Sequence, residues 1–147
     1  MLTKEAKQLL RRVKKHILEE PRRLNMDTLG CRVYSEDGPP CGTVACIAGW
    51  TAVLTKKQLP AQDDVDGWRE LLCNAWEKAT QKLGLSQEES QRLFAEPRFY
   101  GGKDYDYGEN TWPTRFAVRY LRAERPETRA RVTAERIEHF IATNGAE

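Results

Sequence analysis

The stretch VACIAGWTAVL, residues 44–54, decides the fold of this chain because it is apolar on nearly every side. A surface helix has an apolar stripe and a polar face, whereas a helix that is apolar all round is buried. We therefore expect a central helix here, enclosed by the rest of the chain. Thr43 precedes it as a helix N-cap, and the small residues Ala48 and Gly49 allow neighbouring helices to approach closely.

The segments on both sides of this stretch show apolar residues at the spacing of amphipathic helices. No segment alternates as a strand over more than four residues, apart from a short extended piece expected at 32–34. The sequence thus predicts an all-α fold, a compact single-domain bundle of five or six helices around a buried central helix, covering residues 1–147. The expected helices begin after Thr3, after Thr43, near Val65, after Ser86, near Pro113 and near Pro126.

Charge and hydropathy exclude several classes of protein. Lys and Arg number 24 against 22 Asp and Glu, a net charge of +2, whereas a dedicated nucleic-acid binder is more basic. No stretch approaches the roughly 20 apolar residues of a membrane span, and the N-terminus lacks the apolar region of a signal peptide. We expect a cytoplasmic protein with reduced thiols, basic over residues 1–25 and acidic over 84–110.

The segment GPPCGTVACIAGW, residues 38–50, places two cysteines at the start of the central helix and leaves three interpretations open. Cys46 or Cys41 could be a nucleophile with His139 as its base, because a helix N-terminus stabilises a thiolate. The four cysteines could instead bind zinc, although no second close pair completes the usual ligand spacing. The leading interpretation is that the thiols are small buried hydrophobes, so we predict no metal site and no cofactor.

A second candidate site is the segment PRFYGGKDYDYGENT, residues 97–111, together with the residue that follows it. Tyrosine supplies contact area at low entropic cost, which is typical of protein-binding surfaces. The alternative is that several of these rings pack over the core. The same segment only partly matches a calcium loop, because the twelfth position lacks its glutamate. The aromatic residues proposed for binding are Phe99, Tyr100, Tyr105, Tyr107 and Trp112.

The motif CGTVACIAGW resembles the C-G-T-x-x-C-x-A-G-W motif of a family of small uncharacterised proteins of bacteria, notably actinobacteria, and of their phages. The segments LGLSQEESQRLF and RIEHFIATNG are similar to two further segments of that family, although Leu29 and Ser90 replace the expected Trp and Ala. The resemblance implies a compact helical fold and supplies no activity. It also implies that one site or one structural cluster contains Cys41, Gly42, Thr43, Cys46, Trp50 and His139.

Together these features predict a non-enzymatic protein that binds or regulates another protein. An accessory protein of a phage or mobile element would fit this description. Its expected partner is another protein or a second copy of the chain, with no membrane and no nucleic acid. Two alternatives are a cysteine-dependent hydrolase or transferase and a DNA-binding accessory protein. The latter would use the basic first helix, since the helix after Ser86 is acidic and opposes phosphate contact.

Overall fold

The computed structural model describes residues 1–26, 31–32, 43–61, 64–95 and 112–147, which form an all-α bundle with one small strand pair. The all-α prediction is therefore confirmed, with seven α-helices in these described ranges rather than five or six. The elements are α1 (Lys4–Glu19), the 3-10 helix η1 (Pro21–Arg23), β1 (Cys31–Arg32), β2 (Thr43–Val44), α2 (Ile47–Thr55), α3 (Val65–Cys73), α4 (Ala75–Leu83), α5 (Gln87–Phe94), α6 (Thr114–Leu121) and α7 (Pro126–Ala142).

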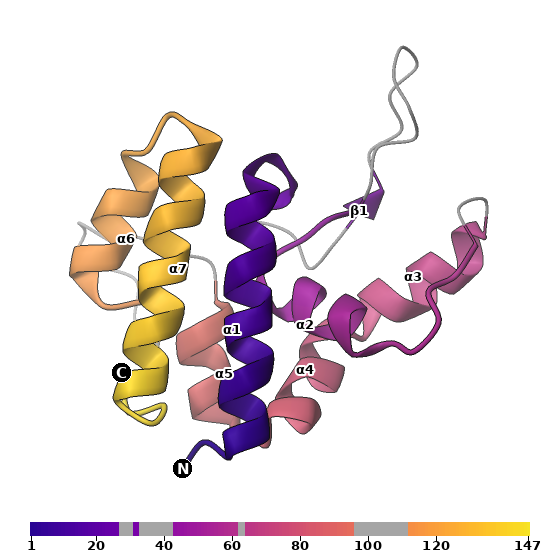
Figure 1. Ribbon diagram of the computed structural model, residues 1–147, viewed down its shortest axis with the longest axis horizontal. Coiled ribbons are helices and arrows are strands. Elements are labelled where there is room, and N and C mark those ends of the chain that lie inside the picture. The colour runs from indigo at the N-terminus through magenta and orange to yellow at the C-terminus, as the bar shows by residue number, and fades with distance from the viewer. Residues whose placement is uncertain (27–30, 33–42, 62–63, 96–111) are drawn as a thin grey trace, which may run out of the picture.

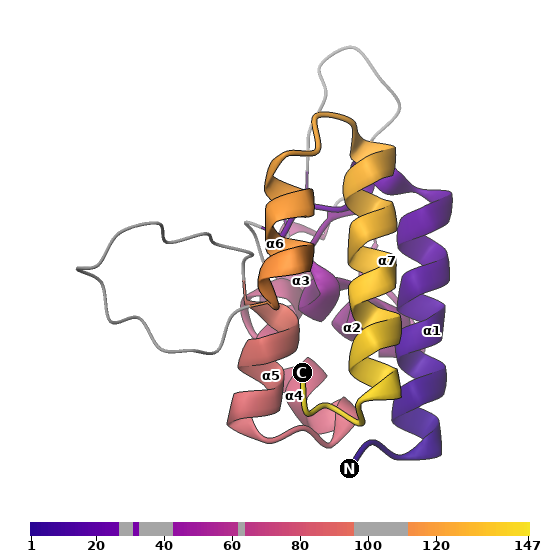
Figure 2. The same cartoon turned by 90° about the vertical axis from the view of Figure 1, so that its left-hand side faces the viewer.

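The two longest helices, α1 and α7, lie side by side in opposite directions (Figure 1). Helix α1 starts where the sequence predicts, because the Thr3 hydroxyl accepts a hydrogen bond from the Ala6 N–H at 3.1 Å. Both ends of the chain lie at the same end of the bundle (Figure 2). The buried faces that meet here follow the predicted spacing, with Ala6, Leu10, Val13 and Ile17 on α1 and Ala130, Ala134, Ile137, Phe140 and Ile141 on α7.

Helix α2 is the buried central helix, and every residue from Ile47 to Val53 is buried. It begins three residues later than the sequence predicts, because the preceding backbone is used in strand-like pairing. The Ala45 N–H donates to the Arg23 carbonyl at 3.0 Å, and the Asn25 N–H donates to the Ala45 carbonyl at 3.1 Å. Thr43 is therefore part of β2, which pairs antiparallel with β1, and Cys46 is the N-cap residue instead.

The expected helix over residues 65–83 is wrong in one respect, since it divides into α3 and α4 at Asn74. Asparagine is a poor residue for a helix interior because its side chain competes for backbone hydrogen bonds. The break turns the chain, so α3 and α4 approach α2 from different directions (Figure 1). Val65, predicted to lie on the buried apolar stripe, is 48% exposed, while Trp68, Leu72 and Ala79 are buried as expected.

The turn between α4 and α5 follows the sequence closely. Gly84 ends α4 in the left-handed conformation with φ 63°, as only glycine does without strain. Ser86 and Glu89 then form both hydrogen bonds of the predicted capping box. Side chains from all seven described α-helices join one hydrophobic cluster. Leu121, predicted to point inward from α6, is 48% exposed.

Much of the basic face of α1 is engaged within the fold. Lys14 Nζ lies 2.6 Å from a carboxylate oxygen of Glu138 on α7, and Arg11 lies 3.9 Å from the same oxygen. Arg12 donates to the carbonyl of Leu54 at the end of α2. These contacts hold α1 against its neighbours, and they reduce the positive charge that this helix offers to a nucleic acid.

Candidate functional site

Cys46, the first candidate nucleophile, is a buried thiol at the start of α2. Its exposed fraction is 1%. Burial raises the pKa of the Cys46 thiol, and the backbone N–H groups of Gly49 and Ala48 offset only part of that rise. A reactive cysteine needs a lowered pKa and solvent access, so this thiol has the properties of a buried hydrophobe. Cys41, the other candidate, lies outside the described residues.

His139, the candidate base, is engaged by groups from α6 and by Glu147. The Arg115 Nη2 atom lies 3.0 Å from Nδ1 and 2.9 Å from Nε2 of the imidazole. A carboxylate oxygen of Glu147 lies 2.8 Å from Nε2. Both ring nitrogens, the atoms that a general base uses, therefore have polar neighbours on Arg115 and Glu147. Trp50 of the resembling motif instead packs against His16 of α1, with ring centroids 4.0 Å apart and the ring planes tilted by 55°.

Alkylation distinguishes a buried thiol from a nucleophile. With iodoacetamide at pH 7.5, we expect Cys73, which is exposed on α3, to react at the rate of a free thiol. Cys46 should react at least about 100-fold more slowly, because its reaction requires local opening of the fold. Peptide mass spectrometry measures the two rates separately, and labelling in denaturant is the control. A native Cys46 that reacts faster than Cys73 would establish the nucleophile interpretation.

The aromatic candidate surface is only partly described, and its described member belongs to the core. Trp112 is 2% exposed. Its Nε1–H donates to the carbonyl of Leu93 at 3.3 Å, and its ring meets Tyr120 edge-on at 5.5 Å. The prediction of Trp112 as a binding residue is therefore wrong, because the ring packs between α5 and α6. The other four members, Phe99, Tyr100, Tyr105 and Tyr107, lie outside the described residues.

In the described ranges, no group of three or more His, Cys, Asp or Glu side chains is placed to hold a metal ion. Cys46 is buried at the start of α2, whereas Cys73 is exposed on α3. None of the helices in the described part of the chain is both long and apolar enough to cross a bilayer.

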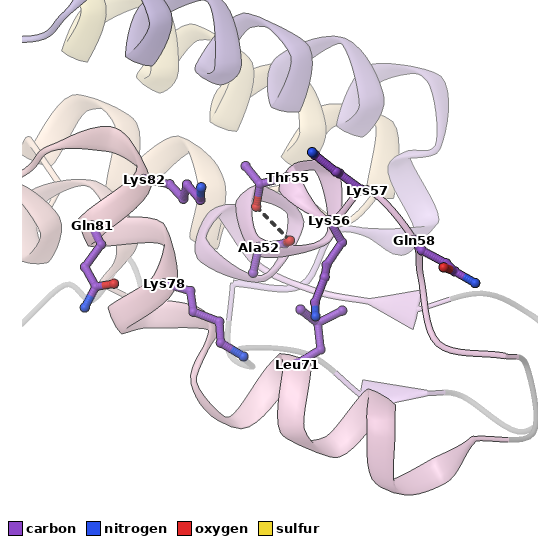
Figure 3. Close-up of a pocket in the computed structure, with 9 residues that line it drawn as sticks. All are labelled: Ala52, Thr55, Lys56, Lys57, Gln58, Leu71, Lys78, Gln81 and Lys82. Atoms are coloured by element: carbon purple, nitrogen blue, oxygen red, sulfur yellow. Dashed lines mark hydrogen bonds between the residues drawn. The ribbon is translucent and has the colours of Figure 1, made fainter.

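A hollow that could receive a ligand lies where α2, α3 and α4 meet (Figure 3). We call it the lysine groove, and its volume is about 580 Å³. Its floor is apolar, formed by the buried residues Ala52 and Leu71. Figure 3 shows the side chains of Lys56 and Lys78 extending toward the space beside Leu71. The lining residues are Ala52, Thr55, Lys56, Lys57, Gln58, Leu71, Lys78, Gln81 and Lys82.

The groove is strongly cationic. Four of its nine lining residues are lysines and none is acidic. Among the described residues, no carboxylate lies within ion-pair distance of these lysines. Lys78 is half-buried, and its Nζ donates to the carbonyl of Glu70 at 3.2 Å, so this ammonium is held between α3 and α4. Positive charges beside an apolar floor favour a ligand that is both acidic and apolar.

A smaller hollow of about 370 Å³ continues the groove along α3. It shares Lys56, Gln58, Leu71 and Lys78 with the lysine groove, and its lining also includes the acidic residues Asp64 and Glu70. The charge therefore changes along the surface, from cationic beside α4 to mixed beside α3. A ligand that covered both hollows would have a defined direction, because charge complementarity fixes the register of two surfaces.

Sequence reasoning missed the lysine groove. The pair Lys56–Lys57 lies in a segment that reads as a surface loop, and Lys78 and Lys82 read as the solvated face of a helix. The one available signal is that Lys78 and Lys82 are four residues apart, which places them on the same side of a helix. Their proximity to Lys56 depends on how α4 packs against α2, which the sequence pattern does not reveal.

Comparison with known proteins leaves the site to be interpreted from its geometry. No family model, no curated protein and no solved structure matches this chain. The resemblance based on the C-G-T-x-x-C-x-A-G-W motif stays a prediction.

Proposed function

We propose that this protein is a non-enzymatic binding protein whose lysine groove receives an acidic, amphipathic segment of a partner protein. The observation that carries the proposal is the set of four lysines without carboxylate partners in the described structure, placed around an apolar floor. A partner segment would place apolar side chains on Ala52 and Leu71 and carboxylates beside the ammonium groups. This is the helix-in-groove mode of recognition, in which apolar anchors bind and charges select.

The chemistry of the lining favours binding over catalysis. The nine described lining residues include no carboxylate, imidazole or thiol. The hydroxyl of Thr55 donates to the carbonyls of Thr51 and Ala52, both at 2.9 Å, so it is used in ending α2. Among the described lining residues, the only titratable side chains are the four lysines, three of which are exposed, whereas a catalytic lysine is activated by desolvation in an apolar pocket or by a neighbouring cation. The groove offers charge and shape instead.

The same lining favours a protein over a nucleic acid. Phosphate recognition on DNA relies on arginine forks as well as lysines, and the lysine groove contains no arginine among its nine residues. Its apolar floor would have no counterpart on a duplex backbone. The carboxylates of Asp64 and Glu70 in the adjoining hollow would also repel phosphates.

A designed acidic peptide tests the proposal. The probe is a fluorescein-labelled 18-residue helical peptide with leucines on one face and glutamates on the other, and its lysine counterpart is the control peptide. We expect the acidic peptide to bind, and the double variant K56E/K78E to bind it about 10-fold more weakly, because two attractive charges become repulsive. Fluorescence anisotropy at 50 and 200 mM salt measures both affinities.

A matched variant separates the groove from net charge. K4E/R22E makes the same charge change at two exposed positions on α1 and η1, and it should bind the acidic peptide within about twofold of the wild type. Equal losses in the two double variants would contradict a specific groove. Duplex DNA that displaces the peptide at 200 mM salt would favour the nucleic-acid alternative, and self-association that K56E/K78E abolishes would identify a second copy as the occupant.

A further inference from the structure

A second cationic cluster lies between α5, α6 and α7, helices that contribute no residue to the lysine groove. Its central residue is Arg136 of α7, the largest fully buried side chain among the described residues. Its guanidinium donates to the main-chain oxygens of Arg92 and Glu147 at 2.9 and 2.8 Å. Its Nε atom has no hydrogen-bond partner in the described structure. A buried cation that keeps one unpaired donor is incompletely compensated.

Burial has a measurable consequence at Arg136. It lowers the pKa of the guanidinium to about 10, and the nearby arginines Arg115 and Arg92 lower it further, while Glu147 opposes them. The group is therefore still protonated at neutral pH. Arg136 is buried whereas Arg115 is exposed, and a buried cation with a second positive charge beside it is stabilised by a nearby anion.

The second arginine of the cluster, Arg115, has its guanidinium against His139 rather than against an acid. Its Nη2 atom lies within 3.0 Å of both imidazole nitrogens, and its charge lies 4.9 Å from the centre of the Phe116 ring. An arginine normally uses its planar fork on a carboxylate or phosphate. Here the guanidinium of Arg115 lies near that of Arg136, and its remaining N–H donors are available to an anion.

The anion present in the cluster is the side chain of Glu147. One of its carboxylate oxygens lies 2.8 Å from His139 Nε2, yet the side chain is 62% exposed. The hydrogen bond from His139, followed by the fields of His139, Arg115 and Arg136, lowers the pKa of this carboxyl. The Glu147 side chain is therefore negatively charged at neutral pH, beside the guanidinium groups of Arg115 and Arg136.

We propose that Arg115 and His139, with the buried charge of Arg136 behind them, form a binding site for a phosphate dianion, and that the Glu147 carboxylate competes with the phosphate for this site. A phosphate brings up to two negative charges and three strong acceptor oxygens, so it matches two guanidinium groups better than one carboxylate does. Arg115 would bind two of its oxygens with its fork, and His139 would donate to another from Nε2 once Glu147 moves away. The ligand is either a small phosphorylated molecule or a phosphorylated side chain.

Isothermal titration with inorganic phosphate at pH 7.5 and constant ionic strength tests the site. We expect E147Q to bind phosphate at least 5-fold more tightly than the wild type, because the competing charge is removed. In the E147Q background, R115Q should weaken binding at least 10-fold. The matched controls are E124Q and R122Q, at exposed positions near the end of α6, which should change nothing. Far-ultraviolet circular dichroism verifies that each variant is folded.

Two further arms identify the source of the phosphate and define failure. A phosphoserine peptide that binds E147Q more than 10-fold tighter than inorganic phosphate, while its unphosphorylated form does not bind, assigns the site to a phosphorylated protein. Equal affinities assign it to a small phosphorylated molecule. Two results would indicate an adventitious ion only and overturn the proposal. In the first, R115Q and R122Q weaken phosphate binding equally; in the second, E147Q leaves phosphate binding unchanged. The lysine groove is untouched by these variants, so the two proposals fail independently.

Discussion

Replacing Trp50 by alanine should lower the free energy of unfolding by about 3–5 kcal/mol, the usual cost of deleting a large buried aromatic side chain. Trp50 lies on the central helix α2 with 3% of its surface exposed. Its ring packs against the tilted ring of His16 on α1, and its Nε1–H donates to the carbonyl of Arg23 in η1 at 3.1 Å. The variant would lose the packing and leave that carbonyl without its donor. Urea denaturation followed by circular dichroism measures the change.

Two variants control the Trp50 experiment. W50F keeps most of the packed ring and loses the indole donor, so it should cost about 1–2 kcal/mol. L59A removes a leucine that is 45% exposed beyond the end of α2, and it should change stability by less than about 0.5 kcal/mol. A W50A variant as stable as L59A would mean that α2 is not the centre of the core.

Replacing Phe140 by alanine should also lower the free energy of unfolding by about 3–5 kcal/mol. Phe140 is completely buried on α7, and the guanidinium of Arg136 lies 5.5 Å from its ring centre. Its ring edge also lies close to Gly145, where an added Cβ would be 3.3 Å from Cζ. The ring thus supports both the α1–α7 pair and the chain that leads to Glu147. The conservative variant F140L should cost no more than about 1.5 kcal/mol.

Together the two alanine variants test whether the helices form one cooperative unit. Trp50 and Phe140 lie on different helices but belong to the same hydrophobic cluster. A single domain unfolds in one transition, so each variant should shift the same urea midpoint, with fluorescence and circular dichroism in agreement. Two separate transitions, one moved by W50A and the other by F140A, would show that the chain contains two folding units.

The sequence was most informative where a structural choice depends on a few neighbouring residues. The N-cap at Thr3, the capping box of Ser86 and Glu89 and the glycine stop at Gly84 all form as predicted. Each is a contact between residues a few positions apart, so no distant partner can override it. The burial of α2 was predictable for a similar reason, because an apolar surface on all sides has no stable position in water.

The errors arose where distant contacts compete with local preference. The start of α2 moved because Ala45 hydrogen-bonds to backbone groups about 20 residues earlier. Trp112 entered the core because α5 and α6 provide it with a carbonyl and a ring partner. Composition alone indicates that a tryptophan has area to bury, and it does not indicate whether a partner protein or the chain itself will bury it.

The sequence by itself determined the all-α class, most helix boundaries and the central position of residues 47–53, because these follow from periodicity, capping and hydropathy. Only the tertiary structure decided which charged groups meet. It brought Lys56 to Lys78 and Lys82 around one groove, and it brought Arg115, Arg136 and His139 to Glu147. Solvated charges leave no periodic signal in a sequence, since any exposed position satisfies them equally, and their proximity follows from how the apolar faces beneath them pack.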